Sequence, residues 1–127
     1  MPKLEYFVVA ESVSVDQTRN TMSVFHILEQ IQAPGFPIVI PMLAAVAHWN
    51  AEDDDMECDS QASVLITFPD GQHKEFNQNF RMTRPRLRTI ANFIGLQISQ
   101  PGTLTIEVRL NGVHKASHTI DIRKIET

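Results

Sequence analysis

The chain has 127 residues, of which 43% are hydrophobic and 20% charged, and its formal net charge is −4. This length fits one domain over residues 1–127 that buries about two thirds of its unfolded surface, and it leaves no room for a second domain. Its first residues lack the basic and apolar segments of a secretion signal, and no apolar run approaches the ~20 residues of a membrane span. We therefore expect a cytoplasmic protein.

Charge is divided unevenly along the chain. Residues 1–60 carry two basic and ten acidic side chains, a net charge of −8, whereas residues 61–127 carry nine basic and five acidic ones, a net charge of +4. In a sandwich the two halves interleave, so the charges either pair internally or form one acidic and one basic rim. The single cysteine, Cys58, excludes an internal disulfide, as expected in a reducing compartment.

Residues 4–31 predict a long opening β-hairpin. Residues 4–15 are rich in valine and aromatic side chains, residues 16–20 form a polar turn, and residues 22–31 supply the second strand. Within the first strand, residues 6–10 are apolar on both faces, which indicates a cover on both sides, provided by a partner chain or a loop.

Residues 38–49 run apolar after the irregular segment Pro34-Gly35-Phe36-Pro37. Pro41 has no N–H for a β-ladder, so it marks an edge position, a bulge or the start of the strand. Residues 42–47 also have a helix-forming composition. The segment between Pro41 and the following acidic run is too short for a convincing helix, so we expect a strand.

Two hairpins follow in which the apolar residues of both strands have even numbers. They are Val64, Ile66, Phe68, Phe76, Phe80 and Met82 in the first hairpin, and Leu104, Ile106, Val108, Ala116, Ile120 and Ile122 in the second. Cross-strand partners on one face sum to a constant, so even-to-even pairing requires a loop of odd length. The sequence therefore predicts three-residue loops at residues 69–71 and 110–112, each ending in a left-handed glycine, with Ile106 opposite Ala116.

Between these hairpins, residues 86–93 fit either a strand or one helical turn, and we expect a strand, a bend at Gly95 and a second strand. The whole pattern predicts an all-β, antiparallel sandwich of about seven to nine strands.

The pattern Gly95-Leu96-x-Ile98-x-x-Pro101-Gly102-x-Leu104 and the hairpin after it resemble the end of immunoglobulin-like domains. Such domains commonly carry tyrosine where this chain has Leu104, and there is no cysteine pair, so the resemblance implies an immunoglobulin-like sandwich that is not of the antibody type. Residues 5–11, the turn Val15-Asp16-Gln17 and residues 36–41 resemble a family of small uncharacterised bacterial proteins. That family has no established activity and therefore implies no site residues.

An acidic run is the most conspicuous local feature, and it consists of Glu52, Asp53, Asp54, Asp55, Glu57 and Asp59. Ca²⁺ takes six to eight oxygen ligands, and loop carboxylates are one way to supply them. The run lacks the alternating spacing and the glycine of a dedicated calcium loop, and blocks of like charge repel one another. We expect a solvated connection, with a cation-binding sensor or metal-dependent enzyme as the alternative.

A basic cluster follows, made of Lys74, Arg81, Arg84, Arg86 and Arg88. Arg81 is out of phase with the three even-numbered arginines, and Phe76 and Phe80 are expected to point inward rather than form a stacking platform. With an isoelectric point near 5.7, nucleic-acid binding is disfavoured. We expect these residues to pair with the acidic half, within the domain or between protomers, and anion or nucleic-acid binding is the weaker alternative.

Neither the histidines nor any known catalytic motif indicates a function for this chain. His114 and His118 share a strand face but stand ~13 Å apart along it, too far for one metal ion, so they are expected to fill an inward face. Nucleophile elbows, zinc-protease, phosphate-loop and dinucleotide motifs are absent from the sequence.

The leading hypothesis is therefore a non-enzymatic interaction module without a cofactor. The stretches at residues 6–10 and 38–47 contain more apolar side chains than one buried sheet face uses, and uncovered apolar surface usually marks an interface. The expected partner is a second copy of the chain or another protein.

Overall fold

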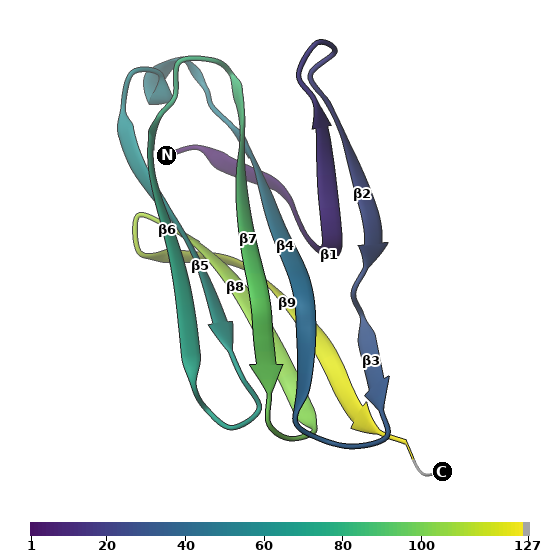
Figure 1. The fold of residues 1–127 in the computed structure, drawn as a ribbon. Helices are drawn as coiled ribbons and strands as arrows, with labels where there is room; N and C mark the ends of the chain where they lie inside the picture. Colours follow the sequence, from purple (N-terminus) through teal and green to yellow (C-terminus); the bar gives the residue numbers. More distant parts are fainter. Residues whose placement is uncertain (126–127) are drawn as a thin grey trace.

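The computed structural model describes residues 1–125 as nine strands and one short 3₁₀ helix (Figure 1). The first sheet has the order β2-β1-β4-β7, with β1 (Lys3–Asp16), β2 (Thr21–Ile27), β4 (Ile38–Asn50) and β7 (Arg86–Ile98). The second has the order β3-β9-β8-β5-β6, with β3 (Gln30–Ala33), β5 (Asp59–Thr67), β6 (His73–Arg81), β8 (Gly102–Leu110) and β9 (Val113–Lys124). The predicted all-β, sandwich-like arrangement is confirmed. Within residues 1–125, no helix has the length and apolarity to cross a membrane.

The core between the sheets takes alternate residues of the central strands. On β4 these include Leu43, Ala45 and Trp49, all fully buried. Trp49 donates from Nε1 to Thr89 Oγ1 on β7 at 3.0 Å, so its polar atom is satisfied inside the core. The prediction of a strand over residues 38–49 is confirmed, and the helical alternative is wrong.

The three-residue loop of the β5–β6 hairpin is confirmed. The N–H of Phe68 donates to Gln72 O at 2.8 Å, and that of Gly71 donates to Phe68 O at 2.9 Å. These bonds enclose residues 69–71, and Gly71 has φ +90°, the left-handed conformation expected of it. Val64 lies opposite Phe76, so even-numbered residues pair as predicted.

The predicted loop of the β8–β9 hairpin is wrong. Leu110 pairs with Val113, so the loop has two residues, Asn111 and Gly112, with φ of +51° and +81°. Positive φ at both positions is the type I′ geometry that an Asn-Gly pair favours. A bulge at Lys115 inserts the extra residue instead, since Arg109 pairs with His114 and Val108 with Ala116.

The bulge also shifts the register beyond it. Ile106 lies opposite His118 rather than Ala116. His114 is exposed, so its predicted inward position is wrong. His118 is half-buried, and its Nε2 lies 2.5 Å from Leu28 O, which can only accept a hydrogen bond.

The opening hairpin is confirmed in its first part only. β1 and β2 pair antiparallel from Ala10 and Ile27 to Asp16 and Thr21, around a turn at residues 17–20. Residues 22–31 do not form one strand, because β2 ends at Ile27 and β3 joins the other sheet, parallel to β9. The sequence pattern carries no mark of this change of sheet.

A shared bend interrupts β4 and β7 at the same level. Gly95 has φ +68°, and Pro41 stands at the matching point of β4. On both strands the buried positions change phase there, from Leu43 to Ile40 on β4 and from Phe93 to Leu96 on β7. The predicted bend at Gly95 is confirmed. In residues 1–125, no strand pairs with β4 at Pro41 on the side of β1, so the predicted edge position of Pro41 is confirmed as well.

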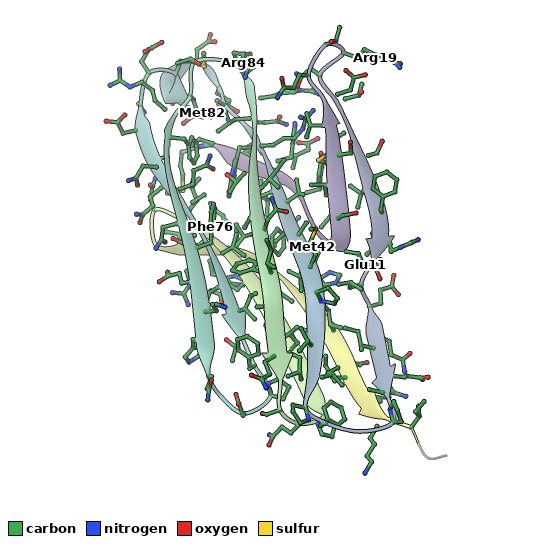
Figure 2. All side chains as sticks on the ribbon, in the orientation of Figure 1. Glu11, Arg19, Met42, Phe76, Met82 and Arg84 are labelled. Carbon is green, nitrogen blue, oxygen red and sulfur yellow. The ribbon has the colours of Figure 1, made fainter. Side chains whose placement is uncertain are left out.

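The distal half of the opening hairpin, residues 12–25, folds back over the first sheet, and we call it the arm. Ala10 is the last residue of β1 that pairs with β4. In Figure 1, β1 then changes direction and rises beside β2, and Figure 2 places Arg19 and Arg84 at the same end of the molecule. Arg88 Nη2 donates to Asn20 O at 2.9 Å, which fixes the tip of the arm against β7.

The arm explains the coverage expected for residues 6–10. Ala10, Ala44 and Val46 alternate with core residues and face away from the core, yet each is fully buried. The cover is therefore the chain's own arm rather than a partner. It is incomplete, because Val8 is half-buried and Tyr6 is 38% exposed.

Candidate functional site

A groove of about 440 Å³ lies where the tip of the arm meets the start of β7, and we call it the arginine groove. Its basic side chains are Arg84, Arg86, Arg88 and His48. The arm contributes Gln17 and Asn20, and the apolar wall is made by Val15, Leu87 and Ile90. None of these residues is acidic, so the groove carries a concentrated positive charge.

The alternation of β7 brings its two arginines together. Arg86 and Arg88 are two residues apart on one strand, so their side chains leave the same face about 7 Å from each other. Arg84 precedes the strand and lines the same groove. In residues 1–125, none of the three lies within 4 Å of a carboxylate oxygen, whereas Arg81 and Arg109 do.

The other two members of the predicted basic cluster lie elsewhere. Arg81, on β6, forms ion pairs with Glu57 at 3.6 Å and Asp59 at 3.1 Å. Lys74, also on β6, lies in the other sheet and does not line the groove. Pairing of the basic cluster with the acidic half within the domain is therefore confirmed for Arg81. In residues 1–125, Arg84, Arg86 and Arg88 form no such pair, and pairing between protomers stays a prediction for them.

His48 connects the groove to β1. It pairs with Arg88 in the sheet, and its ring stacks on Tyr6 with centroids 5.0 Å apart and planes 3° from parallel. Its Nδ1 is buried and has no hydrogen-bond partner within the described residues. Burial, followed by the positive charges of Arg86 and Arg88, lowers the pKa of His48, and Glu5 opposes this only in part.

This arrangement predicts an acid-sensitive contribution to stability. The unfolded chain takes up a proton at His48 near pH 6.5, whereas the folded chain does so only at lower pH. The unfolded state binds more protons in that window, so the free energy of unfolding falls as the pH drops below about 7. Urea denaturation at several pH values between 5 and 8 measures this effect. As the pH falls, the free energy of unfolding is expected to decrease less for His48→Gln than for the wild type. Equal slopes, or the same effect from exposed His114→Gln, would contradict the prediction.

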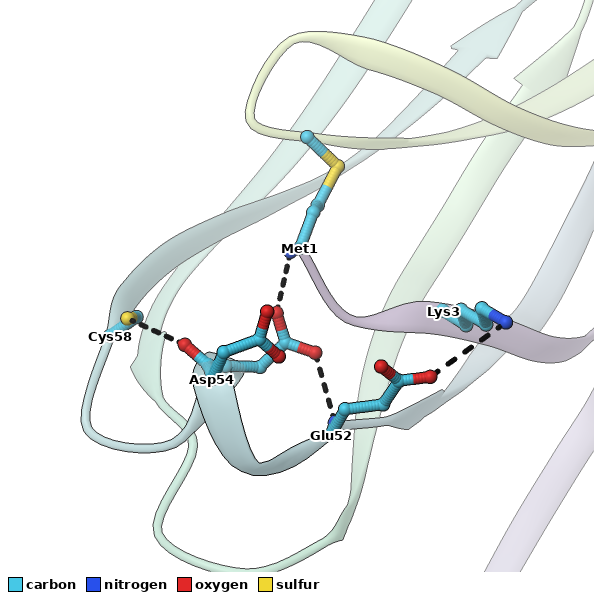
Figure 3. A network of polar contacts seen from close by, with 6 residues as sticks. Met1, Lys3, Glu52, Asp54 and Cys58 are labelled. Carbon is cyan, nitrogen blue, oxygen red and sulfur yellow. Dashed lines mark hydrogen bonds and ion pairs between the residues drawn. The ribbon is translucent and has the colours of Figure 1, made fainter.

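In Figure 1 the acidic run lies at the end of the molecule where β7 begins, and Figure 3 shows the separate contacts that hold it. Asp55 is buried; one of its carboxylate oxygens accepts from the Met1 amino group at 2.5 Å and the other from the N–H of Glu52 at 2.9 Å. The bond from Met1, followed by that from Glu52, lowers the pKa of Asp55. The Cys58 thiol donates to Asp54 O at 3.6 Å.

The remaining carboxylates of the run are divided among different partners. Glu52 faces Lys3 at 3.9 Å, while Glu57 and Asp59 face Arg81. Among residues 1–125, no three His, Cys, Asp or Glu side chains converge as a metal ion would require. Cation binding by this run stays a prediction.

An apolar surface lies at the shared bend of β4 and β7, and we call Val39, Met42 and Ile94 the bend patch. They are 59%, 43% and 74% exposed, respectively, and Met42 lies directly opposite Ile94. Beside them, a groove of about 550 Å³ opens along the free edge of β4, and Leu28 and Ile31 form part of its wall. In Figure 2, Met42 and Glu11, which both line this groove, lie close together.

Residues 5–123 match the model of a family described as a family of unknown function, DUF6941. No curated protein matches the chain.

Proposed function

We propose that this chain, which belongs to the family of unknown function DUF6941, is a non-enzymatic module that associates with a second copy of itself through the bend patch. The observation that carries the proposal is Ile94, a large apolar side chain 74% exposed beside an apolar groove. Single exposed apolar residues are ordinary, but a contiguous set on a flat sheet face next to a hollow is typical of an interface.

The free edge of β4 supports a second copy as the partner. β1 leaves β4 after Ala10, so among the described residues no strand pairs with residues 38–43 on that side. This segment carries no charged side chain, although exposed edges are commonly protected by charges. Two identical edges related by a twofold axis therefore bring no charged side chain of β4 against its copy, and each residue contact occurs twice. Glu11, which also lines the groove, is hydrogen-bonded to His26 at 2.8 Å.

Apolar contact, rather than a continuous β-ladder, is expected to hold the two copies together. Pro41 lies in the middle of the free edge and has no N–H to donate. Val39 and Met42 belong both to the bend patch and to the wall of the groove. Each copy can therefore offer Ile94 to the hollow of the other.

Sedimentation equilibrium between 1 and 100 µM tests the proposal. The wild type is expected to form a dimer, and Ile94→Lys is expected to weaken it about a hundredfold, because the dimer would bury two unpaired ammonium groups. Folding is expected to survive the change, since Ile94 is exposed already.

The matched control is Val113→Lys, which adds the same charge at a 48% exposed valine in another hairpin. It should leave the dimer intact. A wild type that is monomeric at 100 µM, or equal weakening by both variants, would overturn the proposal.

We further infer an immunoglobulin-like sandwich in a bacterial cytoplasm. The strand order β6-β5-β8-β9 matches the C′-C-F-G sheet of variable-type domains, and the neighbours β4 and β7 match strands B and E. The tryptophan of this core, Trp49, stands on β4 rather than on the strand that matches C. The lone cysteine, Cys58, supports the reducing compartment.

A further inference from the structure

We propose that the arginine groove binds a small compound that carries a phosphate group or a chemically similar doubly charged oxyanion. Three guanidinium groups, those of Arg84, Arg86 and Arg88, line one groove without a carboxylate beside them in residues 1–125. Guanidinium groups bind the oxygens of phosphates through paired, charge-assisted hydrogen bonds.

Asp16, between two groove residues in the sequence, and Glu5, whose charge acts on His48, accept hydrogen bonds from neutral groups rather than from the arginines. Asp16 Oδ1 accepts hydrogen bonds from the N–H groups of Thr18 and Arg19 at the base of the arm's turn. Glu5 accepts from Asn50 Nδ2. In residues 1–125, neither carboxylate forms an ion pair with an arginine of the groove. The three like charges of the arginines therefore repel each other until a ligand binds.

The shape of the groove favours a small ligand over a polymer. Its volume of about 440 Å³ lies in the range of small-molecule sites. The tip of the arm closes one side, because Asn20 O accepts a hydrogen bond from Arg88. Leu87 and Ile90 offer apolar surface to the uncharged part of a ligand, and a net charge of −4 disfavours a nucleic-acid backbone.

The protonation of His48 is expected to respond to a ligand in the groove. The charged groups that act on it are Glu5 from β1 and Arg86 and Arg88 from β7, with Arg84 lining the same groove. A bound dianion would offset the arginines and favour the charged imidazolium. Binding is therefore expected to raise the pKa of His48 from its lowered position in the free protein.

Isothermal titration with pyrophosphate, at constant ionic strength set with sodium chloride, tests the proposal. The wild type is expected to bind, and the double variant Arg84→Gln/Arg86→Gln to bind about a hundredfold less tightly, at about tenfold for each arginine. The control Lys74→Gln/Lys124→Gln removes two charges from exposed positions outside the groove and should bind like the wild type.

The melting temperature without ligand separates a binding role from a structural one. Arg84→Gln/Arg86→Gln should melt no lower than the wild type, because the change relieves repulsion between like charges and keeps the bond from Arg88 to Asn20 O. Pyrophosphate should then raise the melting temperature of the wild type and the control, but not that of the double variant.

Three results would overturn the proposal. The first is no heat and no thermal shift with 10 mM pyrophosphate. The second is equal binding by the arginine and lysine double variants. The third is a single- or double-stranded oligonucleotide that binds more tightly than pyrophosphate at the same salt concentration, which would identify a nucleic-acid surface instead.

Discussion

Replacing Trp49 with alanine is expected to lower the free energy of unfolding by about 3–5 kcal/mol, the range for deleting a large aromatic side chain from a packed core. Trp49 is fully buried and belongs to the cluster that joins the two sheets. A domain of this size has about 5–15 kcal/mol of stability in all, so the change removes a large share of it. Urea denaturation followed by circular dichroism measures the change.

Two milder variants separate the contribution of the ring's volume from that of its hydrogen bond to Thr89. Trp49→Phe keeps most of the volume but leaves Thr89 Oγ1 without its donor. Thr89→Val keeps the ring and removes its acceptor, which leaves the indole N–H unsatisfied at a cost of about 1–3 kcal/mol. Both should lose less than Trp49→Ala. A loss below about 1 kcal/mol in Trp49→Ala would contradict the buried position of the ring.

Local rules accounted for the elements of this fold but not for its long-range connections. Face alternation required even-numbered residues to pair in both late hairpins, and they do. At residues 69–71 the loop supplies the odd residue. In the last hairpin Asn111-Gly112 keeps its preferred two-residue turn, and a bulge at Lys115 restores the phase. The even-to-even pairing requires that one extra residue lie between the paired strands. The relative stability of the turn and of a bulge decides whether that residue lies in the loop or in a strand.

The arginine groove shows the same limit more clearly. Residue order shows that Arg84, Arg86 and Arg88 share a phase, and that much followed from the sequence. His48, Gln17 and Asn20 join them because β1 leaves β4 after Ala10 and the arm folds back. No turn residue marks that change of direction, so sequence reasoning missed these members of the site. The one signal in the sequence is that residues 6–10 are apolar on both faces. This pattern indicates that something covers the outer face but does not identify which segment does so.

Placing a carboxylate under the arm, by Val46→Asp, is expected to release the arm from the sheet. Val46 is fully buried on the face opposite the core. An unpaired carboxylate at such a position costs about 3 kcal/mol or more if it stays covered. Swinging the arm away hydrates the charge, so the loss of stability should not exceed the energy with which the arm packs. The amides of residues 12–25 should then exchange faster with deuterium, and trypsin should cleave at Arg19.

Ser14→Asp is the matched control, because it adds the same charge at an exposed position of the arm itself. It should leave amide exchange and cleavage at Arg19 as in the wild type. Val46→Asp is also expected to weaken pyrophosphate binding, since the arm carries Gln17 and Asn20 to the groove. It should leave the bend patch in place, because Ile94 and Met42 lie outside the arm. Faster exchange throughout the sheet, instead of in residues 12–25, would show that the arm is part of the cooperative core and not a cover that opens by itself.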